Sequence, residues 1–288
     1  MSIDLNTPSI DELGDVVLSL REWQKDGAPA QLHPGDLGWN WSFGAEATSA
    51  AVRTWSREGK ILALGFRDSP ALIRLAMAPE AQDDKELVDQ MVIDVTEPER
   101  GVLPEGVVSV EARFGGLFQE NLLRKGWDTD ELWTPLRRDL TEPVEESGVR
   151  IELVGAELVS ERVALQRASF ERSTFSEDRW HAMAGGLPYA DARCLIAYDA
   201  QNTAVAMVTV WSAGPGRPGL LEPMGVHREH RGHGYGTAIT LAAAAALRQL
   251  GSSSAIVCTR SSNVGAVATY RSAGFQQLPD VPDLRRGA

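Results

Sequence analysis

Apolar residues in the second half of the chain gather in runs whose spacing alternates between that of strands and that of helices. Short runs that alternate or are rich in β-branched residues predict strands, and longer runs with apolar residues three and four apart predict helices. This order of elements favours an α/β (α+β) fold, a mixed central sheet flanked by helices. The expected strands are 150–154, 194–198, 204–211, 220–226 and 255–258, and the expected helices are 160–170, 177–183, 237–250 and one that opens at Asn263 and closes at Gly274.

A polar stretch separates this half from the first. Residues 141–148 are acidic and contain Pro143 and Gly148, a composition typical of a linker. We therefore expect two domains, 1–146 and 147–288, with the boundary near Glu146.

Two features of the second half recur 148 residues earlier. Gly274-Phe275 falls on Gly126-Trp127, and Val226, at the end of an expected strand, falls on Ala78. Two separate matches at one offset indicate an old duplication. We expect the N-terminal half to have the same fold.

The segment Arg231-Gly232-His233-Gly234-Tyr235-Gly236 lies between the expected strand 220–226 and the expected helix 237–250. Glycines let backbone N–H groups approach an anion closely, and a helix N-terminus adds partial positive charge, so a pyrophosphate would fit here. A dinucleotide fingerprint would need an acidic residue after a second parallel strand, and a P-loop would need Gly-Lys-Ser/Thr. Neither pattern is present in the sequence.

A second block follows, in which Asn263, Ala266, Tyr270 and Gly274-Phe275 lie along the last expected helix. Together the two blocks resemble the GCN5-related N-acetyltransferases (GNAT superfamily). In that family the pattern Arg/Gln-x-x-Gly-x-Gly/Ala binds the pyrophosphate of acetyl-CoA, and this sequence fills the three defined positions. The resemblance implies acetyl-CoA as the cosubstrate and the amine of a small molecule as the acceptor.

The resemblance also assigns a set of candidate residues. The catalytic candidates are Glu222 and Tyr270. The candidates for cofactor binding are Met224, Val226, Arg231, Gly232, His233, Gly234, Tyr235, Gly236, Thr237, Asn263 and Ala266.

Each candidate role has an ordinary structural alternative. Glu222, beside Pro223 in the strand that leads to the glycine loop, is either the base that takes a proton from the acceptor ammonium or a strand-end carboxylate paired with an arginine. Tyr270 is either the acid for the leaving thiolate or a packed helix aromatic. Asn263 is expected both to cap its helix and to contact the cofactor. Backbone N–H groups near Val226 would stabilise the thioester oxygen if the strand parts from its neighbour.

The N-terminal half lacks these groups at the positions given by the 148-residue offset. Asp83, Glu86 and Val88 replace the anion cradle, and Arg74 and Leu122 stand in place of the candidate base and acid. We therefore expect this half not to bind CoA. The layout resembles tandem family members with one degenerate half, as in mycothiol synthases.

The net charge of the chain limits the classes of partner that it can bind. The chain has 28 Lys plus Arg against 40 Asp plus Glu, a formal net charge of −12, which argues against nucleic acid and anionic membranes. His227, His230 and His233 recur at every third residue, but no cysteine or carboxylate cluster accompanies them in the sequence, so we expect no metal site. The oligomeric state is left open.

Compartment is inferred from two observations. The start of the chain has neither a basic segment nor an apolar stretch, and no run approaches the length of a membrane span. Cys194 and Cys258 lie in apolar runs typical of buried, unpaired residues. A reducing, cytoplasmic location is expected.

Two function classes remain. The first is an acetyl-CoA-dependent N-acetyltransferase that works by direct attack of the acceptor amine, with its acceptor pocket between the halves or beside residues 185–189. The second is a catalytically silent CoA or acyl-CoA sensor or scaffold. The aromatic, glycine-containing segment 33–41 is either a recognition loop or a packed interface, and packing is favoured.

Overall fold

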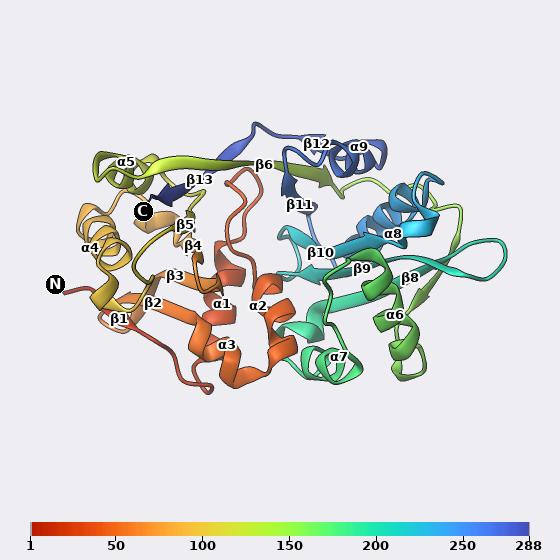
Figure 1. Cartoon of the computed structure of the whole chain (residues 1–288), viewed down its shortest axis with the longest axis horizontal. Coiled ribbons are helices and arrows are strands. Elements are labelled where there is room, and N and C mark those ends of the chain that lie inside the picture. The colour runs from red at the N-terminus through yellow and green to blue at the C-terminus, as the bar shows by residue number, and fades with distance from the viewer. Residues whose placement is uncertain (1, 288) are drawn as a thin grey trace. The chain divides into compact units, whose positions relative to one another are not determined.

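The computed structural model describes residues 2–287, which divide into two compact units (Figure 1). The first unit contains residues 2–33, Ala45–Trp133 and residues 280–287, and the second contains Pro34–Gly44 and Thr134–Pro279. An early segment of the chain thus belongs to the second unit, and the last residues belong to the first. The two sequence domains with a boundary near Glu146 stay a proposal, because the units reflect packing rather than position along the chain.

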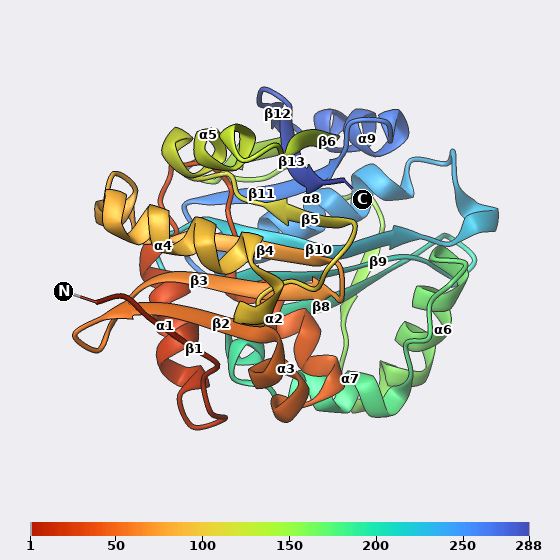
Figure 2. The same cartoon turned by 60° about the vertical axis from the view of Figure 1, so that its left-hand side comes forward.

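The first unit is built on a sheet with the strand order β1-β2-β3-β4-β5-β13-β6, in which β4 and β5 are parallel. Figure 2 shows β1 to β4 side by side, with α4 on the nearer side and α1 on the far side. The strands are β1 Asp4–Asn6, β2 Val52–Arg57, β3 Lys60–Ser69, β4 Leu72–Met77, β5 Val108–Glu111, β6 Asp128–Asp139 up to Trp133, and β13 Val281–Arg286. The helices are α1 Leu13–Trp23, α3 Ala45–Ala51, α4 Lys85–Thr96 and α5 Gly116–Arg124, with the 3-10 turns η2 Pro79–Ala81 and η3 Pro98–Arg100.

The second unit has the strand order β6-β11-β10-β9-β8-β7, and β12 also pairs with β6. Its strands are β6 from Thr134 onward, β7 Arg150–Leu153, β8 Ala192–Tyr198, β9 Ala204–Ser212, β10 Gly219–Val226, β11 Ser254–Arg260 and β12 Gln276–Gln277. Its helices are α2 Pro34–Asn40, α6 Val159–Ser169, α7 Glu177–Ala184, α8 Tyr235–Gln249 and α9 Val264–Ser272, with the 3-10 turns η1 Trp41–Phe43, η4 Ala156–Leu158, η5 Leu187–Asp191 and η6 Arg228–His230.

The two units repeat a common arrangement. Each contains a parallel pair of strands that follow one another among the sheet strands of the chain, β4 with β5 and β10 with β11. Helix α5 begins at Gly116 and α9 at Val264, 148 residues apart, and their last residues, Arg124 and Ser272, have the same separation. The tandem arrangement expected from the sequence is therefore visible in the elements themselves.

The core of the second unit lies on both faces of its sheet. Ile239, Ala243 and Leu247 of α8 pack with Tyr270 on one face. Val163 of α6 packs with residues of α7, β8 and β9 on the other face. Apolar residues three and four apart on α8 explain why this face of the helix is buried.

A buried charged cluster joins the C-terminal strand to the rest of the first unit. The Oε2 atom of Glu111 pairs with Arg74 Nε and Arg113 Nη2, each at 3.1 Å. Asp283 of β13 is 6% exposed, and its Oδ1 has no hydrogen-bond partner among the described residues. Burial, followed by the charge of Glu111, raises the pKa of Asp283 to about 7, although Arg113, Trp133 and Arg74 act to lower it.

This pKa predicts how the stability of the protein depends on pH. Because the pKa of Asp283 is higher in the folded state, its contribution to stability is complete at acidic pH and is lost as pH rises through about 7. Asp283→Asn keeps the side chain neutral, so the variant should unfold several degrees above wild type at pH 8 and close to wild type at pH 5. Thermal unfolding at both pH values tests this, with the exposed Asp128→Asn as control. A difference that does not change with pH would contradict the assignment.

Neither cysteine of the chain is in a disulfide. Cys194 is buried and Cys258 is half-buried, and both are free thiols. Within residues 2–287, no helix combines the length and the apolar character needed to cross a membrane.

Candidate functional site

The glycine loop leaves the start of α8 open. Gly232 and Gly234 have φ of +82° and +83°, the left-handed region that favours glycine, and no atom lies within 4 Å of the position a Cβ would take in either residue. Gly234 is the N-cap of α8, and no side chain caps the helix. The loop residues 231–234 are exposed. Free N–H groups of the first turn and an unfilled approach above the loop suit a phosphate group.

Two arginines anchor this loop to α6. Arg231 Nη2 donates to the carbonyl of Ser169 at 2.9 Å, and Arg228 donates to the carbonyls of Ala168 and Arg167 at 2.8 Å. These carbonyls belong to the last turn of α6, where backbone acceptors lack helical partners. The side chain of Arg231 thus has a structural task that the sequence did not suggest.

Gly236 permits a close approach of α8 to α9. A Cβ on Gly236 would come within 2.9 Å of Thr269 Cγ2 and 3.5 Å of Val226 Cγ2. The first turn of α8 therefore lies against both α9 and the end of β10. A larger residue would push the helix N-terminus away from the strand.

Strands β10 and β11 pair only where they begin. Their register contains Gly219 with Ala255 and Leu220 with Ile256, and no later pair among the described residues. On the other side, the register of β10 with β9 shifts between Leu221 and Met224. Strand β10 thus separates from β11 before it reaches Val226. This separation is the condition under which N–H groups near Val226 could face the thioester oxygen.

Glu222 lies in this irregular stretch, and its peptide bond to Pro223 is cis. The Glu222 side chain is half-buried, whereas Tyr270 is 6% exposed. Burial, followed by the charges of Glu222 and Cys258, raises the pKa of the Tyr270 phenol above its ordinary value. The structure therefore brings the two catalytic candidates close enough to interact, and it keeps the phenol protonated across the neutral range.

The cofactor candidates of the two sequence blocks meet around one core. Four of them, half-buried, pack against the cluster that contains Tyr270; these are Met224, Val226, Tyr235 and Ala266. Asn263 caps α9, since its Oδ1 accepts from the N–H of Ala266 at 3.2 Å. Thr237 is half-buried in the first turn of α8.

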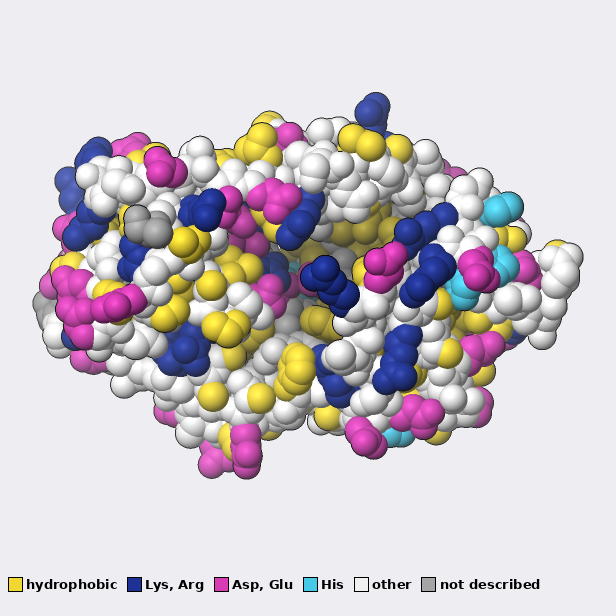
Figure 3. All heavy atoms as spheres, in the orientation of Figure 1, with side chains coloured by type: hydrophobic (Ala, Val, Ile, Leu, Met, Phe, Trp, Pro, Cys, Tyr) yellow, Lys and Arg dark blue, Asp and Glu magenta, His cyan; other side chains and the backbone are white. Residues whose placement is uncertain are grey.

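The three histidines near the loop make contacts of their own. His227 Nδ1 accepts from the N–H of Glu229 at 3.2 Å, and the ring of His233 stacks on Tyr235 with centroids 6.1 Å apart. Figure 3 shows histidine side chains beside basic ones on the surface near α8. No group of three or more potential metal-binding side chains occurs in residues 2–287.

The sequence patterns did not identify one residue that contacts the candidate base Glu222. Trp211, at the end of β9, donates from Nε1 to the carbonyl oxygen of Glu222 at 2.6 Å. Helix α2 lies on the indole of Trp211 through Gly35 and Gly38. Two glycines three residues apart in the sequence could have indicated a helix face without side chains. This spacing does not predict that the face packs on Trp211 of a distant strand.

In the first unit, the helix that corresponds to α8 is α4, and side chains of the protein already bind at its N-terminus. Asp84 caps α4 by accepting from the N–H of Leu87 at 3.0 Å. Arg57 pairs with Asp84 at 2.6 Å and with Glu86 at 3.1 Å. Carboxylates therefore lie at the start of this helix, where they would repel an anionic ligand, and the absence of CoA binding in this half stays a prediction.

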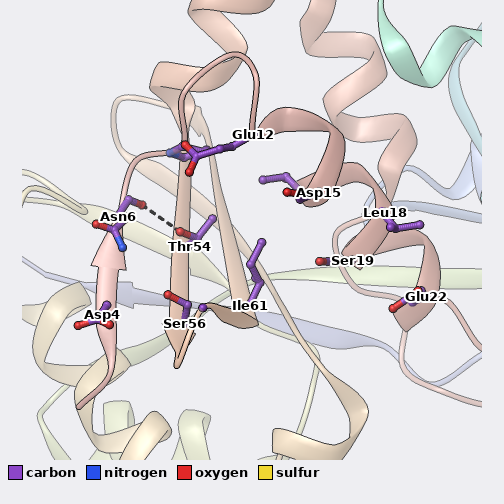
Figure 4. A pocket seen from close by; sticks show the side chains of 13 residues that line it. Asp4, Asn6, Glu12, Asp15, Leu18, Ser19, Glu22, Thr54, Ser56 and Ile61 are labelled. Carbon is purple, nitrogen blue, oxygen red and sulfur yellow. Dashed lines mark hydrogen bonds between the residues drawn. The ribbon is translucent and has the colours of Figure 1, made fainter. Parts of the chain in front are cut away.

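The first unit also contains a pocket of about 500 Å³ that includes none of the candidate residues. Figure 4 shows it between α1 and the strands β1 and β2. The ionisable residues of its lining are Asp4, Glu12, Asp15 and Glu22, and no described residue of the lining is basic. Its side chains offer no positive charge to the phosphates of CoA.

Comparisons with known proteins agree with this geometry. The model of the acetyltransferase (GNAT) family matches residues 157–275, which include every candidate residue. No curated protein matches the chain by sequence.

Among solved structures, the chain is similar to a tandem GNAT protein from the clavulanic acid biosynthesis pathway, with 14% identity, a TM-score of 0.59, and coverage of 99% of this chain and 98% of that one. A GCN5-related N-acetyltransferase from Sphaerobacter thermophilus has 16% identity and a TM-score of 0.57, with coverage of 99% and 95%. A GNAT-family acetyltransferase from Colwellia psychrerythraea has 15% identity and a TM-score of 0.57, with coverage of 99% and 98%. These similarities confirm the predicted tandem fold.

Proposed function

We propose that this chain acetylates the amine of a small-molecule acceptor by direct attack on acetyl-CoA, a proposal supported by the match of its residues 157–275 to the acetyltransferase (GNAT) family. The observation that carries this proposal is the open start of α8, with its uncapped N–H groups and two glycines at positive φ, beside strands that part. When bound, acetyl-CoA supplies the acetyl group as a thioester.

The residues of the second unit have distinct proposed tasks. The loop N–H groups of Gly232, Gly234 and the first turn of α8 would hold the pyrophosphate, with Asn263 and Ala266 alongside it. Backbone N–H groups near Val226 would stabilise the negative charge that develops on the carbonyl oxygen.

Proton transfer would involve Glu222 and Tyr270. Glu222 would take a proton from the acceptor nitrogen, directly or through water, as the new C–N bond forms. Tyr270 would give its proton to the sulfur as the C–S bond breaks, and its raised pKa keeps that proton available. The two unpaired thiols are compatible with the proposed reducing, cytoplasmic location.

The first experiment is thiol release from acetyl-CoA by the full chain with a panel of amines and amino sugars. The dissociation constant of acetyl-CoA is measured by calorimetry on the same sample. Turnover with any amine supports the transferase. Tight binding of acetyl-CoA without turnover across the panel favours the sensor or scaffold. If the protein neither binds acetyl-CoA nor turns it over, the assignment of the glycine loop as a cofactor site is refuted.

A base role for Glu222 predicts a pH-dependent defect. Glu222→Gln should lower kcat/KM at neutral pH by about 100-fold or more, because the variant cannot accept the proton. The defect should shrink as pH approaches the amine pKa of about 10, where the acceptor is already neutral. A kcat/KM profile over pH tests this, with Glu157→Gln, an exposed carboxylate of the same unit, as the control. A defect that stays constant with pH would contradict the base role.

A further inference from the structure

The carbonyl of Glu222 accepts a hydrogen bond from a side chain at an irregular point of the strand. Leu221 pairs with Val210 and Met224 with Val208, so Glu222 and Pro223 lie at a shift in the register of the two strands. Trp211 Nε1 donates to this carbonyl at 2.6 Å, and the indole is fully buried. A backbone carbonyl shielded from water needs a donor, and the indole N–H supplies one for this part-buried carbonyl where the register of the strands shifts.

Helix α2 fixes the indole from the other side. A Cβ on Gly35 would lie 2.5 Å from Cγ of Trp211, and one on Gly38 would lie 2.4 Å from its Cζ3. Only glycine at both positions lets the helix rest on the ring at this separation. The ring of Tyr189 meets the indole edge to face, with centroids 6.0 Å apart, and fixes it further.

Helix α2 makes further contacts within the second unit. Trp39 stacks on Phe175 with ring centroids 5.1 Å apart. In the turn that follows α2, Ser42 accepts from Arg179 Nη2 at 2.9 Å, and the guanidinium of Arg179 lies 3.8 Å from the ring centroid of Phe43. The helix that covers the indole is therefore held on the unit by contacts independent of Trp211.

We propose that Trp211, held in place by α2, is a positioning residue for the acetyl transfer, and that it sets the backbone of Glu222 and hence the direction of its carboxylate. The inference rests on the proposed function. A base works only within hydrogen-bond reach of its proton, and a small misplacement lowers turnover steeply. An early segment of the chain would thus contribute to catalysis without touching a substrate.

The test removes the indole N–H and keeps an aromatic ring. Trp211→Phe should lower kcat by about 10- to 100-fold while the dissociation constant of acetyl-CoA stays within about twofold of wild type, since the loop and α8 are untouched. Trp180→Phe is a matched control, because Trp180 is also buried and its Nε1 has no hydrogen-bond partner among the described residues. The control should keep wild-type turnover.

A double-mutant cycle separates positioning from a general loss of packing. In the Glu222→Gln background, Trp211→Phe should cost much less than in wild type, because there is no longer a base to position. Gly38→Ala, which pushes a methyl group against the indole, should reproduce the kcat defect of Trp211→Phe. Additive losses in the cycle, or an equal loss in Trp180→Phe, would overturn the proposal.

The same data distinguish the two levels of inference. If Glu222→Gln lowers turnover and Trp211→Phe does not, the positioning role fails and the proposed function stands. If no amine is acetylated by the wild-type protein, the proposed function fails first.

Discussion

Gly234→Glu is expected to abolish detectable binding of acetyl-CoA while the protein stays folded. Position 234 has φ of +83°, and no atom lies within 4 Å of the place a Cβ would take, so the new side chain would enter the space above the loop. A carboxylate there would repel the phosphates and block the approach of the backbone N–H groups. Loss of about two charge-assisted hydrogen bonds corresponds to a weakening of about 100-fold or more. Titration calorimetry with acetyl-CoA measures this directly.

A control for Gly234→Glu must introduce the same backbone strain at a position outside the proposed phosphate site. Gly216→Glu does so, because Gly216 has φ of +72°, is equally open, and lies in the loop before β10 rather than after it. Both variants should lose a similar amount of stability, about 1–2 kcal/mol for a side chain in the left-handed region. Unchanged affinity in Gly234→Glu, or equal weakening in both variants, would refute the phosphate site.

Local features of the sequence predicted the elements around the glycine loop well. The strand expected at 220–226 is β10, Gly219–Val226, and the helix expected to open at Asn263 is α9, capped by that residue. These elements have strong local signals, an apolar run next to glycines and a capping side chain. The helix expected from Thr237 begins two residues earlier, at Tyr235, because Gly234 in the left-handed conformation completes the turn directly before it.

The exchange of segments between the units could not be predicted in the same way. Residues 34–40 contain proline and two glycines, which have low helix propensity, and the sequence therefore favoured a turn-rich packed segment. They form α2 because packing on Trp211 compensates for that propensity, and the partner is more than 170 residues away. Strand β13 was not expected either, since its pairing with β5 and β6 depends on long-range register.

The sequence alone also did not predict which contacts the individual site residues make. Arg231 matches the family pattern, yet its guanidinium donates from Nη2 to the carbonyl of Ser169 at the end of α6, a contact that the pattern does not indicate. Glu222 of β10 and Tyr270 of α9 interact electrostatically although they are far apart in the sequence, and no local pattern predicts such an interaction.

Tyr270→Phe is expected to lower kcat by about 100-fold or more with little change in the affinity for acetyl-CoA. The phenol is buried, and burial together with the charges of Glu222 and Cys258 raises its pKa, so it stays protonated at neutral pH. A thiolate leaving group has a much lower pKa, about 8.5, but it still gains from a proton as the C–S bond breaks. Phenylalanine keeps the packing against Phe275, whose ring centroid is 5.9 Å from that of Tyr270, and removes only the proton donor.

Tyr198→Phe provides the matched control for this variant. Tyr198 is also buried in the second unit, and burial raises its pKa to about 12, but its hydroxyl donates to Glu161 of α6. Its replacement should reduce stability modestly and leave kcat near that of wild type. If the donor role is correct, Tyr270→Phe should also lose less activity with an acetyl donor whose thiol is more acidic, because a better leaving group needs the proton less. Equal turnover in wild type and Tyr270→Phe would remove the acid role and leave Tyr270 as a packing residue of α9.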